Sequence, residues 1–160
     1  MLFRSCVEAG DACPIPYDGD PADAVRALWT QVAEGTLPGL PDRPAVSESV
    51  LQTAIITALY SEDLWLALAE GIALGLAGDG SILVQLADAY TQRQPDGTWG
   101  NELEASSVIQ CMDITRAPTD QERAALDAER SELAPLIFPP GTVTPWLRSE
   151  ERRVGKECRL

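Results

Sequence analysis

The chain has 160 residues, of which 45% are hydrophobic and 23% are charged, a balance typical of one soluble globular domain. Its net charge of −13 argues against a nucleic-acid partner, because such a partner requires a basic face. The chain contains no histidine. A serine triad with its imidazole proton shuttle, or a zinc site that needs histidine ligands, therefore cannot be completed within it.

The N-terminal segment carries two cysteines, Cys6 and Cys13, separated by the turn-forming residues Gly10 and Asp11 and followed directly by Pro14. Their spacing suits a small disulfide loop, whereas two cysteines without histidine do not make a zinc site. The first residues lack the apolar core of a signal peptide. No apolar run later in the chain approaches the roughly 20 residues of a membrane span.

A first helix is predicted from Pro21 to about Gly35, because Asp20 can cap it and proline is favoured at the first helical position. An apolar stripe follows at helical spacing, formed by Val25, Leu28, Trp29 and Val32. A calcium loop through Asp18, Asp20 and Asp23 is the alternative interpretation. The loop template requires glycine at its sixth position and glutamate at its twelfth, where this chain has Asp23 and Trp29, so capping is favoured.

Two further helices are predicted after a proline-rich connector over residues 36–44. Ser47 can cap the first of them, and Ser61 the second, with Glu62 and Asp63 favourable at the positive end of the helix dipole. Apolar residues lie all round the helix after Ser61, which predicts that it is largely buried. Its two glycines, Gly71 and Gly75, are interpreted as sites of close helix packing.

The fourth helix follows a break at Gly78-Asp79-Gly80, and its apolar stripe consists of Ile82, Leu83, Leu86, Ala87 and Tyr90. Pro95-Asp96-Gly97 is a predicted turn, and residues 103–113 have no decisive period. Thr119 and Glu122 form a capping box that opens a helix to about Leu133, before a proline-rich segment. The sequence therefore predicts a mainly α chain without a core sheet.

Three regions are expected along the chain. Residues 1–117 form a helical region with the N-terminal cysteine loop, and residues 118–147 form the capped helix and the proline-rich segment. Residues 148–160 contain five basic and three acidic residues, unlike the strongly acidic sequence before them, and resemble a read-through tail. We interpret them as a non-native or disordered tail, with a native basic tail as the alternative.

Several local patterns together resemble the tripeptidyl-aminopeptidase-like branch of the α/β-hydrolases, which are mostly secreted actinobacterial serine peptidases and esterases. The segment Phe3–Pro14 is similar to a cysteine pair of that family, and Leu59–Ala69 looks like its pair of lid helices. Residues 78–88 resemble its next helix. Val108–Asp113 resembles an Ala-Ile-x-Cys-x-Asp pattern at the end of the lid. The resemblance covers about residues 2–136, and the order of these patterns makes it more specific than any single one.

The resemblance implies that the chain is the helical lid, or cap, segment of an α/β-hydrolase. The family's catalytic serine, in a Gly-x-Ser-x-Gly elbow, would precede this region, and its acid and histidine would follow. Cys111 would pair with a downstream cysteine, although a buried free thiol is an equal alternative. The expected location is extracellular or in the cell envelope. The chain alone is expected to be inactive, with no catalytic residue, metal or cofactor of its own.

The resemblance also suggests residues that contact a peptide or ester substrate. Tyr60, Trp65 and Trp99 could line the pocket, with packing in the core as the favoured alternative for Trp65. Glu62, Asp63 and Asp113 are candidates on chemistry alone for holding a substrate ammonium group. Two other hypotheses remain open, namely a self-contained acidic α-helical binding module and an independent enzyme that uses carboxylates alone.

Overall fold

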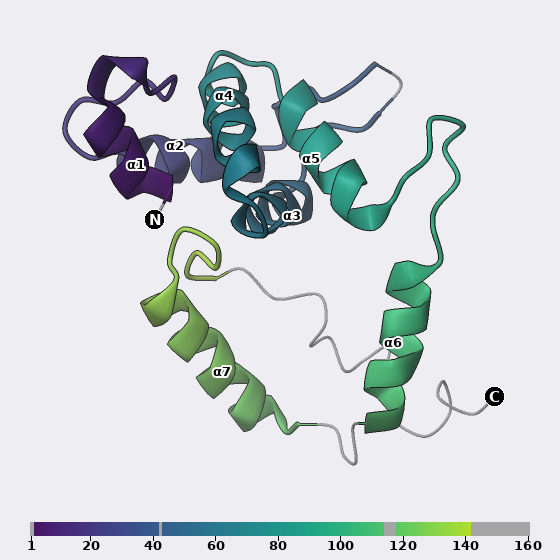
Figure 1. The fold of residues 1–160 in the computed structure, drawn as a ribbon. Helices are drawn as coiled ribbons and strands as arrows, with labels where there is room; N and C mark the ends of the chain where they lie inside the picture. The colour runs from purple at the N-terminus through teal and green to yellow at the C-terminus, as the bar shows by residue number, and fades with distance from the viewer. Residues whose placement is uncertain (1, 42, 114–117, 142–160) are drawn as a thin grey trace. The chain divides into compact units, whose positions relative to one another are not determined.

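The computed structural model describes residues 2–41, 43–113 and 118–141, and this part of the chain is mainly helical with no β-sheet (Figure 1). The predicted mainly α class is thus confirmed. The chain divides into two compact units, Met1–Arg93 and Gln94–Leu160, and each is considered by itself. The proposed tail over residues 148–160 lies outside the described residues. No helix in the described ranges is both long enough and apolar enough to cross a membrane.

The predicted caps form at the starts of three helical segments. Helix α2 (Pro21–Ala33) begins after Asp20, whose carboxylate accepts a hydrogen bond of 2.9 Å from the Ala22 amide. Helix α3 (Glu48–Leu59) is capped by Ser47, which accepts from the Val50 amide at 3.3 Å. Ser61 caps a short 3₁₀ helix, η2 (Glu62–Leu64), which leads directly into α4 (Trp65–Leu76). The capping interpretation of Asp20 is therefore confirmed.

The N-terminal helix α1 (Leu2–Ala9) and the 3₁₀ helix η1 (Gly10–Ala12) are closed into a small ring by a disulfide. The bond joins Cys6 to Cys13, as predicted, with their Cα atoms 5.0 Å apart. Gly10 permits the sharp turn through its positive φ of 53°. The Tyr17 hydroxyl donates a hydrogen bond to the Cys6 carbonyl at 3.4 Å, and α1 packs against α2.

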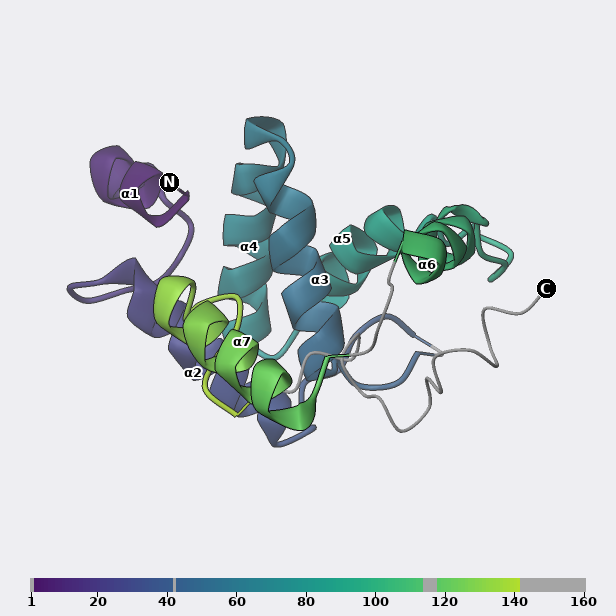
Figure 2. The same ribbon diagram turned by 90° about the horizontal axis from the view of Figure 1, so that it is seen from below.

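The core of the first unit lies among α2, α3, α4 and α5 (Ser81–Thr91), which pack against one another in Figures 1 and 2. Each of these helices contributes side chains that are fully removed from solvent, in agreement with the apolar stripes predicted for α2 and α5. Among them are Val25, Leu28, Leu51, Ala54, Ala58, Leu68, Ile72 and Leu83, each with 0% exposure. The first unit therefore has a hydrophobic core of its own.

Two glycines of α4 allow its backbone to approach neighbouring helices. A Cβ atom added at Gly75 would lie 2.9 Å from a methyl carbon of Leu28 on α2. One added at Gly71 would lie 3.1 Å from a methyl carbon of Ile82 on α5. Both distances are shorter than ordinary carbon contacts, so the packing interpretation of these glycines is confirmed.

Helix α4 is buried on one side only, which falls short of the prediction that it is largely buried. Leu68 and Ile72 are fully buried, but Leu66 and Leu74 are 60% and 40% exposed. The reason is that α2, α3 and α5 pack on one side of α4, whereas apolar residues occur on all its sides. Within the first unit, the other side of α4 therefore presents leucine side chains to solvent.

The connector between α2 and α3 is an ordered loop, which we call the connector loop (residues 37–41 and 43–46). The Val46 amide donates to the Leu37 carbonyl at 2.8 Å, which closes the base of the loop, and both side chains are buried. The Gly80 amide, just before α5, donates to the Pro38 carbonyl at 2.8 Å. The connector loop is thereby fixed to the turn between α4 and α5.

The second unit contains α6 (Glu102–Asp113) and α7 (Asp120–Leu133). The predicted capping box at Thr119 and Glu122 is present, and the Arg130 guanidinium lies 5.8 Å from the centre of the Phe138 ring. Residues 102–113 form a helix although their sequence has no decisive period. Helix α7 has no buried residue, and Val108 and Ile109 on α6 are exposed.

The one-sided burial of α4 predicts different effects for two matched substitutions. Leu68→Ala should lower the free energy of unfolding by about 2–5 kcal/mol, because it removes a fully buried side chain and leaves a cavity. Leu66→Ala, on the same helix, should change it by less than about 0.5 kcal/mol. Urea denaturation followed by circular dichroism measures both values. Equal losses for the two variants would contradict the burial described for α4.

The disulfide should contribute measurably to the stability of the first unit. Replacing both Cys6 and Cys13 by alanine should lower the free energy of unfolding by about 2–3 kcal/mol, because the unfolded chain regains the entropy of the open loop. Mass spectrometry after non-reducing digestion should show a peptide pair joined through these two residues. Two free thiols in protein prepared under oxidising conditions would contradict the bond.

Candidate functional site

Four of the five residues predicted to bind substrate lie in the turn between α3 and α4, which we call the α3–α4 corner (residues 59–66). Tyr60 ends α3, Glu62 and Asp63 belong to η2, and Trp65 begins α4. The Ser61 side chain accepts a hydrogen bond from the Asp63 amide and fixes the turn that connects them. The corner also exposes Leu59 and Leu66 by 51% and 60%, so apolar and acidic groups face solvent within eight residues.

Tyr60 reaches a second tyrosine on another helix. Its ring centre lies 6.0 Å from that of Tyr90 on α5, with 42° between the ring planes, and we call these residues the aromatic pair. Tyr60 is 75% exposed, whereas Tyr90 is partly buried. Burial raises the pKa of the Tyr90 phenol, and a hydrogen bond with Tyr60 raises it further. Tyr90 was predicted as part of an apolar stripe and not as a site residue.

Trp65 is only partly buried, so it is neither a fully packed core residue nor a freely exposed one. Its indole nitrogen is inaccessible to solvent and has no hydrogen-bond acceptor among the described residues. A buried donor without an acceptor is unfavourable by about 1–3 kcal/mol. Trp65 therefore combines an apolar surface at the α3–α4 corner with an unsatisfied polar group beneath it.

The acidic groups of the corner face solvent. Glu62 and Asp63 are both exposed, and no described basic side chain forms an ion pair with either of them. Such carboxylates can attract a cation, but solvent screens them. No cluster of three or more acidic or cysteine side chains in the described part of the chain could hold a metal ion.

Asp113 and Trp99, which were also considered from the sequence, belong to the second unit. Trp99 is 57% exposed, so it is not packed in the core. Asp113 is the last residue of α6, and its side chain, like that of Cys111, lies outside the described residues. The contacts predicted for Asp113 and Cys111 therefore stay predictions.

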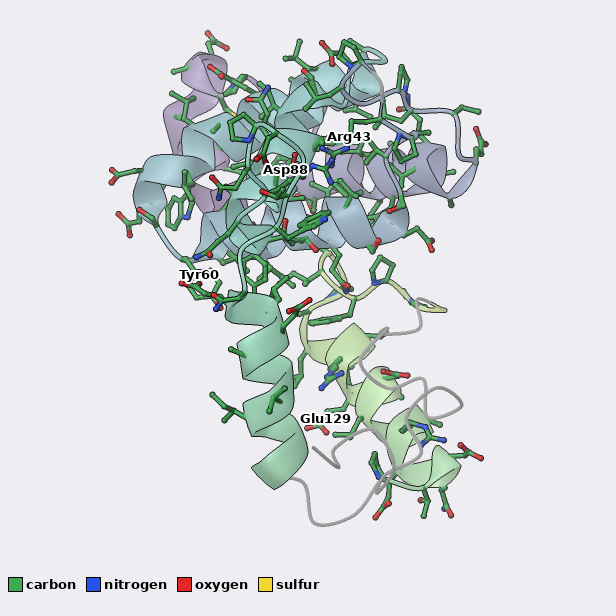
Figure 3. The ribbon with its side chains drawn as sticks, turned by 90° about the vertical axis from the view of Figure 1, so that its right-hand side faces the viewer. Arg43, Tyr60, Asp88 and Glu129 are labelled. Atoms are coloured by element: carbon green, nitrogen blue, oxygen red, sulfur yellow. A yellow bond between two sulfur atoms is a disulfide. The ribbon has the colours of Figure 1, made fainter. Side chains whose placement is uncertain are left out.

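The sequence did not indicate an ion pair between the connector loop and α5. The Arg43 guanidinium donates two hydrogen bonds to the Asp88 carboxylate, at 3.0 and 2.9 Å, and Figure 3 shows the two side chains pointing toward each other. These bonds raise the pKa of Arg43 above its ordinary value. No local pattern could have revealed this contact, because 45 residues separate the two partners.

Comparisons with known proteins show which proteins the chain resembles. No protein-family model matches the chain. The serine protease Hip1 of Mycobacterium tuberculosis (strain ATCC 25618 / H37Rv) is 32% identical over 133 residues, which cover 76% of this chain and 25% of that protein. Hip1 of Mycobacterium bovis (strain ATCC BAA-935 / AF2122/97) gives the same values. Carboxylesterase B of Mycobacterium tuberculosis (strain ATCC 25618 / H37Rv) is 30% identical over 138 residues, or 79% of this chain and 24% of that protein.

The chain is similar to serine hydrolases. It spans about a quarter of the length of the relatives that it matches. Their printed names support a serine hydrolase-like family, which agrees with the broader part of the resemblance that the sequence suggested.

The aromatic pair predicts a loss of stability at alkaline pH. The folded chain holds the Tyr90 proton more tightly than the unfolded chain does, and this difference stabilises the folded state. The stabilisation is fully present below the ordinary tyrosine pKa of about 10. It should be lost as the pH rises from about 10 through the raised pKa that Tyr90 has in the folded state. Tyr60→Phe should lower the Tyr90 pKa by removing the hydrogen bond, although burial should still keep it raised.

A pH titration of ¹³C-labelled tyrosine by NMR measures the Tyr90 pKa directly. Tyr17→Phe is the control, because Tyr17 forms a hydrogen bond with Cys6 at the other end of the unit and should leave Tyr90 unchanged. An ordinary pKa for Tyr90 in the unchanged chain would contradict the described environment.

Proposed function

We propose that the chain is the lid and substrate-pocket portion of a serine α/β-hydrolase that cleaves peptide N-termini or related esters and amides. The similarity to a quarter of a serine protease and of a carboxylesterase carries this proposal. The helical composition of the described residues supports it, because a lid requires no sheet. The absence of histidine supports it further, since the triad's base would have to come from another part of the enzyme.

In this proposal the lid does not carry out the chemistry. The nucleophile, base and oxyanion hole belong to an α/β core that lies outside the chain, and the lid supplies pocket walls and excludes water. Tyr60 and Trp65 provide apolar surface for substrate, while Glu62, Asp63 and Asp113 provide negative charge. The exposed residues of the α3–α4 corner support this role, because substrate contacts require accessible side chains. No cofactor is required.

The exposed leucines of α4, Leu66 and Leu74, also support a covered position for their side of the helix. Their exposure is unfavourable in water and would be relieved if another part of the enzyme or a substrate packed against them. In this proposal residues 1–117 are the helical lid region with the N-terminal cysteine loop, and residues 118–147 are the capped helix and the proline-rich segment.

The enzyme is proposed to act outside the cell or in the cell envelope. The disulfide between Cys6 and Cys13 supports an oxidising compartment, where such bonds persist. The strongly acidic composition supports the expectation that nucleic acid is not a partner.

One observation favours a second candidate, a self-contained acidic helical binding module. The first unit buries a continuous set of apolar side chains among α2, α3, α4 and α5, without help from another chain. A self-contained module requires that the apolar faces of its helices point into its own core. Leu59, Leu66 and Leu74 remain exposed, and such apolar surface would serve a binding partner of the module as well as the α/β core of the enzyme.

Labelling with a fluorophosphonate probe tests the first proposal. The purified chain should not react, because it would lack the activated serine. A longer polypeptide from the same reading frame, containing the elbow serine and the downstream histidine, should react stoichiometrically. Replacing the elbow serine by alanine in that polypeptide is the control and should abolish labelling.

Two outcomes would contradict the lid proposal. The first is stoichiometric labelling of the chain by itself. The second is a flanking sequence without a Gly-x-Ser-x-Gly motif upstream, which would favour the independent binding module.

A further inference from the structure

Near its C-terminal end, helix α5 is held at three residues that are each two positions apart, namely Leu86, Asp88 and Tyr90. The buried Thr57 hydroxyl on α3 shares its proton between the Thr53 carbonyl of its own helix, at 2.7 Å, and the Leu86 carbonyl, at 3.1 Å. Asp88 accepts the two hydrogen bonds from Arg43, and Tyr90 packs against Tyr60. The helix ends immediately afterwards, at Gln92, whose φ of 53° is left-handed. The last turns of α5 thus contact α3 and the connector loop at successive alternate residues.

Arg43 is itself firmly placed. The connector loop that carries it is closed by the hydrogen bond between Val46 and Leu37, and it is tied to Gly80 through Pro38. The guanidinium forms a two-pronged pair with Asp88, and the two side chains are only 23% and 21% exposed. Two parallel hydrogen bonds fix both the distance and the relative orientation of the guanidinium and the carboxylate, whereas a single ionic contact fixes only the distance. The pair can therefore define where this part of α5 lies.

The contacts at Asp88 and Tyr90 act from different directions. Two residues apart on an α-helix correspond to a rotation of about 200°, so these side chains project from nearly opposite sides of α5. The connector loop holds one side through Asp88, and α3 holds the other through Tyr90 and the Leu86 carbonyl. A displacement of the last turn of α5 would consequently disturb the aromatic pair.

We propose that Arg43 is a positioning residue for the α3–α4 corner. Through Asp88 it holds the end of α5 so that Tyr90 remains against Tyr60, and the exposed Tyr60 ring thereby keeps a defined place in the corner. Whether this position of Tyr60 serves substrate binding rests on the proposed function. The effect of Arg43 on the position of Tyr60 does not depend on the proposed function.

Tyrosine NMR on the full chain tests the link without substrate. In Arg43→Gln and Asp88→Asn, the cross-peak between the Tyr60 and Tyr90 rings should weaken, and the titration midpoint of Tyr90 should fall toward the ordinary value of about 10. The exchanged pair, Arg43→Asp with Asp88→Arg, should restore both signals in part. Arg26→Gln is the matched control, because it removes an ion pair with Asp23 on α2 that does not contact α5.

Three outcomes would overturn the proposal. In the first, folded Arg43→Gln and Asp88→Asn leave the cross-peak and the Tyr90 midpoint unchanged. In the second, Arg26→Gln changes the cross-peak and the Tyr90 midpoint as much as Arg43→Gln does, which would make the effect a general consequence of the lost charge. In the third, both single variants unfold globally by circular dichroism, because the pair would then hold the whole unit and not the corner. Each leaves the lid proposal standing, which fluorophosphonate labelling tests separately.

Discussion

The first unit depends on the close approach of α4 to its neighbours at Gly71 and Gly75. Because neither residue has a side chain, Leu28 from α2 and Ile82 and Leu83 from α5 can pack directly against the α4 backbone. This contact packs one side of α4, with Leu68 and Ile72, into the core and leaves Leu66 and Leu74 on the exposed side. The α3–α4 corner lies at the start of this helix, where the short segment after Leu59 leads from α3 to Trp65.

The corner combines a fixed framework with an accessible surface. The cap at Ser61, the hydrogen bond from Thr57 and the fork between Arg43 and Asp88 fix the backbone around it. Its own side chains, above all Tyr60, remain open to solvent. A rigid frame that presents exposed aromatic groups is well suited to form one wall of a binding site, since little conformational entropy is lost when a ligand packs against it. This arrangement supports the lid proposal, which the similarity to the relatives carries.

Much of the fold could be predicted from sequence because its signals are local. A cap at Asp20, Ser47 or Thr119 depends on a few neighbouring residues, and so does the ring between Cys6 and Cys13. The burial of α4 was overestimated because periodicity shows which residues are apolar but not how many neighbouring helices surround them. The aromatic pair and the ion pair at Asp88 arise from tertiary packing, so no spacing in the sequence reveals them.

The N-terminal ring has a kinetic consequence. Its two sulfur atoms belong to residues seven positions apart, so their encounter requires only the short segment between them and no part of the later helices. Oxidation can therefore precede the assembly of the core, and the ring can present α1 to α2 already bent into its final path. In an oxidising compartment, this unit would in this way begin folding with α1 already covalently joined to the segment that follows it.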